Sequence, residues 1–120
     1  MKTGVVVFAH GSRVESANQA VRTVAAELAR KGQLSHVQAA FLELGQPDLE
    51  GAIAMLVEHG VDRVIIVPYF LTLGLHMERD LPPLAAAISN KFKGLHIRVS
   101  PPLDGHPALV DVLLDRVRQG

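Results

Sequence analysis

Residues 4–9 read GVVVFA, and this uninterrupted apolar stretch decides how the fold is interpreted. A second run of the same kind, Arg63–Pro68 (RVIIVP), lies farther along the chain. Continuous β-branched runs of this length are typical of strands that are covered on both faces. Two more mixed runs, Val37–Leu42 and Leu95–Ser100, are interpreted as flanking strands. The sequence therefore predicts a sheet built from these runs.

Each run is followed by a segment with helical periodicity. The first such segment ends at Gly32 and has apolar residues on one helical face, namely Val21, Val24, Ala25 and Leu28. The second begins at Pro47 and ends at Gly60, with an apolar face made of Leu49, Ile53 and Leu56.

The two remaining segments begin at prolines or next to them. Asp80 is expected to cap a third helix with Pro82 and Pro83 in its first turn, and this helix should end near Gly94. Pro107 is expected to start the last helix, whose buried face would be formed by Val110, Leu113, Leu114 and Val117.

The alternation of strands and helices predicts an α/β fold. We expect a three-layer sandwich in which a parallel sheet of four strands carries helices on both faces. Right-handed crossovers favour the flavodoxin-like strand order 2-1-3-4.

Size and composition limit the classes of function. The 120 residues fit a single domain spanning 1–120, and Lys plus Arg (12) balances Asp plus Glu (12), so no nucleic-acid or membrane partner is indicated. The chain has no cysteine, which excludes disulfides and thiolate metal sites. The apolar run near Met1 is too short for a signal peptide or a membrane span, so we expect a cytoplasmic protein.

Three candidate donors are predicted at one edge of the sheet. Ligands of open parallel sheets bind beyond the carboxyl ends of the strands. His10 follows the first strand, Glu43 ends the second, and His76 lies in an unusually apolar connection, Tyr69–Arg79. Two imidazoles and a carboxylate suit a divalent ion such as Co²⁺, Fe²⁺, Ni²⁺ or Zn²⁺. An apolar loop of this kind indicates a lid, a ligand wall or an interface.

Each donor taken singly also has an ordinary structural interpretation. His10 could cap or pack, Glu43 could pair with a helix dipole, and His76 could be a surface residue. Their placement on one predicted edge favours a shared site. The other histidines are interpreted as structural, with His106 as a helix-start residue that could also line the pocket: His36, His59, His96 and His106.

The turn Gly11-Ser12-Arg13 has two interpretations. A glycine turn before a helix can bind anions through backbone N–H groups, and Arg13 could pair with a substrate carboxylate. Arg13 could equally be a solvated surface residue. The turn lacks the GxGxxG pattern and the P-loop lysine, so nucleotide binding is not indicated.

Four ordered motifs carry a resemblance to a known family. They are AHGSR at 9–13, FLELGQP at 41–47, VPYFLTLGLHMERDLP at 67–82 and PPLDGHP at 101–107. Together they resemble the small CbiX-type sirohydrochlorin chelatases of the class II chelatase family, over nearly the whole chain. The resemblance implies a lyase that inserts Co²⁺ or Fe²⁺, with Ni²⁺ as a further candidate, into sirohydrochlorin. Two protons would be released, in cobalamin or sirohaem biosynthesis.

The same resemblance implies roles for individual residues. His10 would be a metal ligand and proton acceptor, His76 a second metal ligand, and Glu43 an assistant to either step. Because sirohydrochlorin is a polycarboxylate, Arg13 and backbone N–H groups could receive its acidic side chains, and Ser12 in the same turn is a further substrate-binding candidate. The tetrapyrrole-contacting positions would be Gln46, Leu71, Thr72, Leu73, Gly74, Leu75 and His76. Some short relatives carry a further histidine where Leu73 stands, which leaves the preferred metal open.

Long members of the family hold two such domains, so this chain corresponds to one half and is expected to form a homodimer. The metal would be a substrate, and no organic cofactor is implied. A non-catalytic metal or tetrapyrrole carrier would use the same residues. A histidine phosphatase is disfavoured, because that family has arginine directly before its histidine, where this chain has Ala9.

Overall fold

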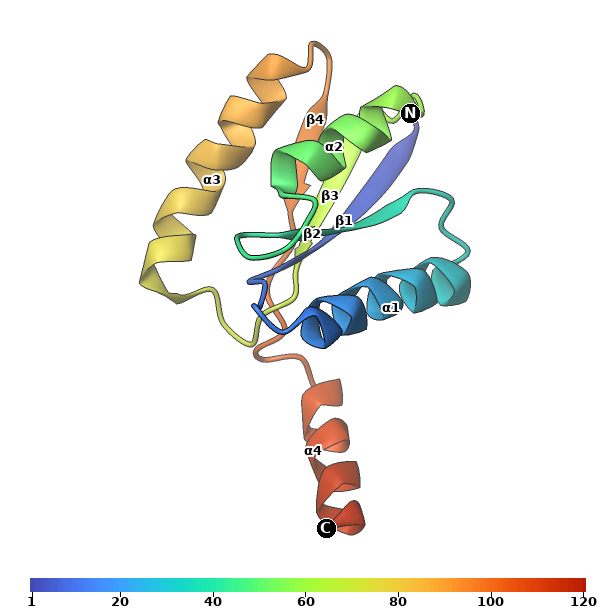
Figure 1. The fold of residues 1–120 in the computed structure, drawn as a ribbon, viewed down its shortest axis with the longest axis vertical. Coiled ribbons are helices and arrows are strands. Elements are labelled where there is room, and N and C mark those ends of the chain that lie inside the picture. The colour runs from blue at the N-terminus through green and yellow to red at the C-terminus, as the bar shows by residue number, and fades with distance from the viewer.

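The computed structural model describes all residues, 1–120, and contains one parallel sheet (Figure 1). The strands are β1 (Thr3–Ala9), β2 (Val37–Phe41), β3 (Arg63–Pro68) and β4 (His96–Val99). Their order is β2-β1-β3-β4, and every neighbouring pair is parallel. The predicted fold class and strand order are therefore confirmed.

The apolar run at residues 4–9 becomes a central strand because it is covered on both faces. Val6 and Phe8 face one cluster of buried side chains, and Val7 and Ala9 face another. Successive side chains of a strand point to opposite faces, so a strand buried on both sides must be apolar at every position.

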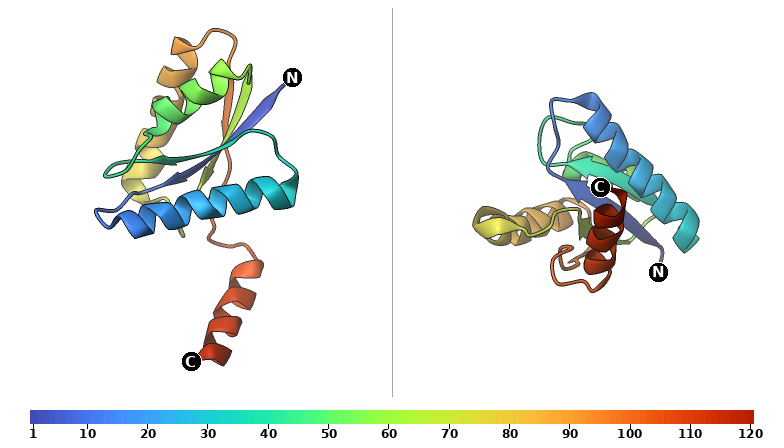
Figure 2. Two further views of the ribbon diagram at one scale, coloured as in Figure 1. Left: turned by 45° about the vertical axis from the view of Figure 1, so that its right-hand side comes forward. Right: turned by 90° about the horizontal axis from the view of Figure 1, so that it is seen from below.

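Three helices form the outer layers (Figure 2). Helix α1 (Glu15–Gly32) covers β1 and β2 on one face, and α2 (Leu49–Glu58) and α3 (Gly74–Lys91) cover the opposite face. The larger core cluster lies between the sheet and these last two helices. Helix α2 begins after Asp48, whose side chain accepts a hydrogen bond from the Gly51 N–H; Pro47 lies outside the helix, contrary to the prediction.

Helix α3 begins earlier than predicted. It starts at Gly74 rather than after Asp80, so Pro82 and Pro83 lie inside it. A proline in a helix interior costs about 3 kcal/mol or more, which is why the sequence suggested a start just before them. The burial of apolar side chains on the same helix, Leu81 and Ile88 among them, opposes this cost.

The last helix begins next to Pro107 as predicted, but the prediction that one of its faces is buried was wrong. Helix α4 (Ala108–Gln119) projects from the carboxyl edge of the sheet and belongs to neither layer (Figures 1 and 2). None of its residues is buried. Its amphipathic pattern correctly predicted a helix with one apolar face, but periodicity does not specify the surface against which that face packs. None of the helices is both long and apolar enough to cross a membrane.

Candidate functional site

His10 and Glu43 lie side by side beyond the carboxyl ends of β1 and β2. The Leu42 N–H donates to the Ala9 carbonyl (2.9 Å) and the Glu43 N–H donates to the His10 carbonyl (3.1 Å). The parallel ladder therefore continues past both strands. It brings His10 Nε2 to 3.1 Å from Glu43 Oε1, while 58% and 57% of the two side chains stay exposed. The pair is held by backbone and remains open to a ligand.

The protonation of this pair follows from its geometry. An ionised carboxylate accepts hydrogen bonds and cannot donate them, so the Nε2 of His10 carries a proton in this contact. In the neutral imidazole the other nitrogen, Nδ1, then has a lone pair. No protein group contacts Nδ1 within hydrogen-bond distance. His10 thus presents an unoccupied nitrogen donor beside a carboxylate.

Gly11 allows this close approach. Its φ is +95°, and a Cβ built on it would lie 1.7 Å from the carbonyl oxygen of Glu43. Any side chain at position 11 would therefore push the two loops apart. The glycine after His10 is explained by contact between loops, in addition to its unusual backbone conformation.

The side chain of Asn18, on α1, connects the two loops through hydrogen bonds. It is 1% exposed, and its amide accepts from the Ser12 N–H (2.8 Å) and donates to the carbonyls of Ser12 (2.8 Å) and Leu44 (3.0 Å). One buried side chain therefore connects α1, the loop after β1 and the loop after β2. Buried amides with satisfied partners stabilise a unique arrangement.

Arg22 provides a second connection, from α1 to the loop that follows β2. Its guanidinium donates to the carbonyl of Gln46 (2.9 Å) and to Glu15 (2.6 Å), and it lies over the Phe41 ring, 5.2 Å from the centroid. The hydrogen bond from Arg22, followed by that from Asn18, lowers the pKa of the Glu15 carboxyl.

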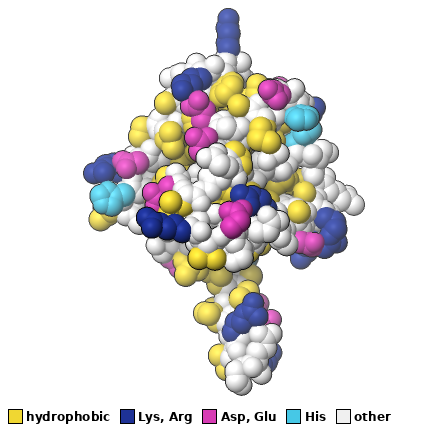
Figure 3. All heavy atoms as spheres, in the orientation of Figure 1, with side chains coloured by type: hydrophobic (Ala, Val, Ile, Leu, Met, Phe, Trp, Pro, Cys, Tyr) yellow, Lys and Arg dark blue, Asp and Glu magenta, His cyan; other side chains and the backbone are white.

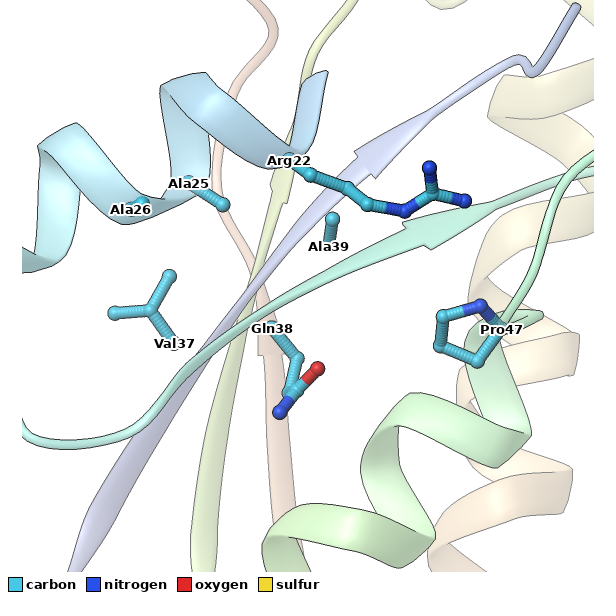
Figure 4. A pocket seen from close by; sticks show the side chains of 7 residues that line it. All are labelled: Arg22, Ala25, Ala26, Val37, Gln38, Ala39 and Pro47. Atoms are coloured by element: carbon cyan, nitrogen blue, oxygen red, sulfur yellow. The ribbon is translucent and has the colours of Figure 1, made fainter. Parts of the chain in front are cut away.

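The pocket beside Arg22 is a structural feature rather than the candidate site. Figure 4 shows Arg22 extending from α1 across β2, with Ala25 and Ala26 on the same helix, Ala39 on the strand and Pro47 on the loop that follows it. The pocket has a volume of about 230 Å³, below the ~300–1,000 Å³ of typical ligand pockets. None of His10, Glu43 and His76 lines it.

His76 lies in the first turn of α3, not in a loop as predicted. Its Nδ1 is 3.2 Å from Nη2 of Arg79, and Arg79 Nε donates to Asp80 (3.1 Å). A guanidinium can only donate, so Nδ1 of His76 is the acceptor and its lone pair is engaged. His76 is therefore not available as a nitrogen ligand at Nδ1 until Arg79 moves away.

The apolar connection after β3 is divided between core and solvent. Phe70, Leu73 and Met77 pack against the larger core cluster, and the Phe70 ring meets Phe8 edge-on with centroids 6.0 Å apart. Leu71 and Leu75 point outward and are 67% and 84% exposed. Only part of the predicted ligand wall therefore faces solvent.

The other residues predicted to contact the substrate differ in whether their side chains already have partners in the chain. Arg13 is exposed and its side chain has no hydrogen-bond or ion-pair partner in the chain. Ser12, in contrast, is engaged within the loop: its N–H donates to Asn18, and its Oγ accepts from the Val14 N–H (3.0 Å). Gln46 is exposed, with its carbonyl bound to Arg22.

The structure thus contains one donor pair and a separate histidine. No group of three or more His, Asp or Glu side chains is close enough to hold a metal ion. Of the other histidines, His59 contacts the Met55 carbonyl through Nδ1 (2.9 Å). His106 accepts the Ala108 N–H (3.0 Å) at the start of α4, which confirms its helix-start role.

Sequence reasoning missed Asn18 and Arg22. A signal for Asn18 was present, because it lies on the helical face of Val21 and Ala25, where a polar residue is unexpected. Arg22 carried no such signal. Its partners, Gln46 and Phe41, come from a distant part of the chain.

Comparisons with known proteins agree on one family. The CbiX family model matches residues 4–120. The chloroplastic sirohydrochlorin ferrochelatase of Arabidopsis thaliana is 31% identical over 115 residues, which cover 96% of this chain and 51% of that protein. The sirohydrochlorin cobaltochelatase of Sulfolobus acidocaldarius is 31% identical over 116 residues, with 97% and 90% covered.

A solved structure has the same fold. The sirohydrochlorin chelatase SirB of Bacillus subtilis subspecies spizizenii, in complex with cobalt, superposes with a TM-score of 0.91 at 24% identity. The match covers 99% of this chain and 51% of SirB. The chain therefore spans about half the length of SirB and of the plant relative, and nearly the full length of the archaeal one.

Proposed function

Since the chain belongs to the CbiX family, we propose that it is a sirohydrochlorin chelatase. It inserts a divalent metal ion, Co²⁺ or Fe²⁺, into sirohydrochlorin and releases two protons. The metal is a substrate and the reaction needs no organic cofactor; Ni²⁺ is a further candidate ion. Relatives named for cobalt and for iron, both 31% identical to this chain, support these two metals.

The observation that carries the proposal is the His10–Glu43 pair at the end of the central strand. Metallation requires a site that holds a partly hydrated ion and then takes protons from two pyrrole N–H groups. The free Nδ1 of His10 suits either task, and the hydrogen-bonded Glu43 stabilises the imidazolium that forms when it accepts a proton. A pair that leaves coordination positions open suits transfer of the ion.

His76 is the second metal ligand in this proposal. Arg79 occupies its Nδ1 in the free protein. Binding of the ion at Nδ1 replaces that hydrogen bond, and Asp80 retains the guanidinium. His10 then makes the first contact with the ion and His76 joins it later.

The tetrapyrrole lies against the start of α3. Leu71 and Leu75, both exposed, offer apolar surface to the macrocycle, and the backbone of Thr72, Leu73 and Gly74 runs between them. The unpaired guanidinium of Arg13 receives an acidic side chain of the substrate, with Ser12 and Gln46 nearby in the same loops. This assignment places charge and apolar surface where sirohydrochlorin, a polycarboxylate with a flat ring, requires them.

We also propose that residues 1–120 form one chelatase domain, that two copies form a homodimer and that the protein acts in the cytoplasm. The single donor pair and the exposed Leu71 and Leu75 leave the site open. A second copy would supply the missing wall, much as a second half is present in relatives twice as long.

A spectroscopic rate comparison tests the function. The protein is mixed at catalytic concentration with excess sirohydrochlorin and Fe²⁺, Co²⁺ or Ni²⁺ in turn, and the absorption change is followed against a protein-free control. We expect many turnovers with Co²⁺ or Fe²⁺. A single stoichiometric change for all three ions would instead indicate a carrier, and no change above the control would contradict both.

A further inference from the structure

Two histidines meet at the amino edge of the sheet, where the strands begin, on the opposite side from the candidate site. His36 directly precedes β2 and His59 directly follows α2. Their ring centroids lie 6.1 Å apart, with the ring planes tilted by 45°. Figure 3 shows histidine side chains at the surface in two separate places, one beside the start of α3 and one beside the end of α2. Because His59 is exposed and His36 is half-buried, the pair is open to a ligand from solvent.

Backbone hydrogen bonds hold both histidines in place. The Val5 N–H donates to the His36 carbonyl (2.8 Å), which continues the ladder between β1 and β2 before β2 begins. His59 caps the end of α2, and its N–H donates to the Leu56 carbonyl (3.0 Å). The sheet and the helix that covers it therefore fix the two backbones, so only the side chains have to move to share a ligand.

The hydrogen bond of the His59 ring defines which of its nitrogens is free. Its Nδ1 lies 2.9 Å from the Met55 carbonyl oxygen. A carbonyl can only accept, so Nδ1 carries the proton, and Nε2 of the neutral ring then has a free lone pair. Histidines that bind metals almost always donate their other ring N–H to a backbone carbonyl, a carboxylate or water, which fixes the tautomer and the ring orientation. His59 thus presents Nε2 as a nitrogen donor.

His36 supplies a second nitrogen. Its ring forms no hydrogen bond or ion pair within the chain, so it can turn toward His59 without losing a partner. A tetrahedral ion with metal–nitrogen distances of about 2.0–2.1 Å holds two nitrogens roughly 3.3 Å apart. Rings whose centroids are 6.1 Å apart are close enough to reach this spacing when His36 rotates.

The pocket at this pair offers nitrogen and oxygen donors but no carboxylate. It has a volume of about 210 Å³ and is lined by Ser35, His36, Val37, Gln38, Leu56 and His59. The charged group that contacts His59 is a cation, Lys2, whose ammonium donates to the His59 carbonyl. Binding of an ion here therefore depends on ligation by imidazole and not on attraction by negative charge. Such donors suit a borderline ion, whereas Mg²⁺ and Ca²⁺ require oxygen ligands.

We propose that His36 and His59 form a metal site separate from the candidate site, which takes Ni²⁺, Co²⁺ or Zn²⁺ through two imidazole nitrogens and water. The five residues of β2 separate it from the pair of His10 and Glu43, a distance of roughly 16 Å at ~3.3 Å per residue. One ion cannot bridge the two sites, so the chain has places for two. The inference goes beyond the proposed function and does not rest on it.

Calorimetric titration with Ni²⁺ alone tests this site. The protein is the full chain without a polyhistidine tag, and it carries His10→Ala and His76→Ala so that the candidate site is removed. We expect one Ni²⁺ per chain, and no comparable binding of Mg²⁺.

Removal of either proposed ligand should then weaken the binding. Added to the same protein, His59→Ala or His36→Phe should lower the Ni²⁺ affinity at least tenfold, since even the outer-shell partners of metal ligands contribute about 10–100-fold. Phenylalanine keeps a ring at the half-buried position 36, and circular dichroism checks the fold of both variants. The matched control is His96→Ala, which removes an exposed histidine at the same edge of the sheet and should leave the affinity unchanged.

Three outcomes would overturn the proposal. A folded protein that lacks His10 and His76 and binds no Ni²⁺ would show that the two rings only pack against each other. A loss of affinity with His59→Ala but not with His36→Phe would show that His59 acts without His36. Equal affinities in the His59→Ala, His36→Phe and His96→Ala proteins would place the ion elsewhere. None of these measurements uses sirohydrochlorin, so this site and the proposed function can fail separately.

Discussion

His10 and His76 both lie beyond the carboxyl edge of the sheet, yet the chain holds them in different ways. The loop of His10 is joined to the loop of Glu43 by backbone hydrogen bonds, and the buried amide of Asn18 connects both to α1. His76 stands on an exposed helical turn, where its only side-chain partner is Arg79, itself on the surface. The first half of the site is exposed but lies on loops that a buried residue anchors, and the second lies on an exposed helical turn.

The difference suggests a division of labour. A donor that must accept protons in a defined direction benefits from a fixed position, because misplacement by about 1 Å can cost 10²-fold in rate. A ligand that joins and leaves the ion during transfer benefits from a weak, replaceable partner. The changes described next, from the largest expected effect to the smallest, test this difference between the two halves.

Removal of the fixed donor should have the largest effect. His10→Ala is expected to lower chelatase turnover by about 10²–10⁴-fold, the usual contribution of a general base. Circular dichroism should stay unchanged, because the side chain is exposed. Steady-state rates with Co²⁺ measure the loss. A folded variant that keeps more than about a tenth of the activity would reject the role of base.

Displacement of His10 from Glu43 should have the next largest effect on turnover. Gly11→Ala places a Cβ against the Glu43 carbonyl and should separate His10 from Glu43, with a loss of turnover of roughly 10²-fold. Gly94→Ala, far from the candidate site, is the matched control. Its φ is also positive, at +81°, but a Cβ there meets nothing within 4 Å. Equal losses in the two variants would show that backbone strain, and not the approach of the loops, matters.

Loss of the His76 side chain should weaken metal binding more than tetrapyrrole binding. His76→Ala is expected to weaken Co²⁺ binding by about tenfold, and binding of metal-free tetrapyrrole much less, because Leu71 and Leu75 remain. Separate calorimetric titrations with the two ligands measure both affinities. Loss of tetrapyrrole binding alone, or equal loss of both, would contradict the assignment.

Arg79→Met should have the opposite effect on metal binding. The substitution removes the donor that occupies Nδ1 of His76, so Co²⁺ affinity is expected to rise by several-fold. The same titration checks this effect. Unchanged or weaker Co²⁺ binding would mean that Arg79 does not compete with the ion.

Loss of the buried Asn18 amide should lower the stability of the folded protein. Asn18→Ala leaves the Ser12 N–H and the Leu44 carbonyl without their partner, at a cost of about 1–3 kcal/mol in the free energy of unfolding. Ser16→Ala, an exposed change on the same helix, is the control. Urea unfolding gives both values. Asn18→Ala and Ser16→Ala proteins of equal stability would refute the structural role of the amide.

The smallest effect should come from Glu15 and depend on pH. Its pKa is lowered in the folded protein, chiefly by Arg22, so it stabilises the fold above its unfolded pKa and loses this contribution as pH falls through the folded value. Glu15→Gln should therefore lower the melting temperature slightly at neutral pH and not at strongly acid pH. A difference that persists unchanged in acid would contradict the ion pair.

The sheet was predictable in detail, whereas the site was predictable only in part. The runs at Gly4–Ala9 and Arg63–Pro68 identified the two central strands, and the placement of His10 and Glu43 beyond the carboxyl ends of β1 and β2 followed from topology. The contact between His10 and Glu43 did not follow, because it depends on Gly11 and on the ladder beyond the strands. The hydrogen bond from Arg79 to His76 was not predicted from the sequence either.

What the sequence by itself determined is the set of elements and their order. Hydrophobic periodicity and β-branched runs are local properties, and right-handed crossovers leave few ways to connect them. Only the tertiary structure decided where α3 begins and where α4 lies. Helix α3 extends through Pro82 and Pro83 because distant core residues pack on it. The apolar face of α4 is a local pattern, but where the helix lies is not, and no other part of the chain buries that face.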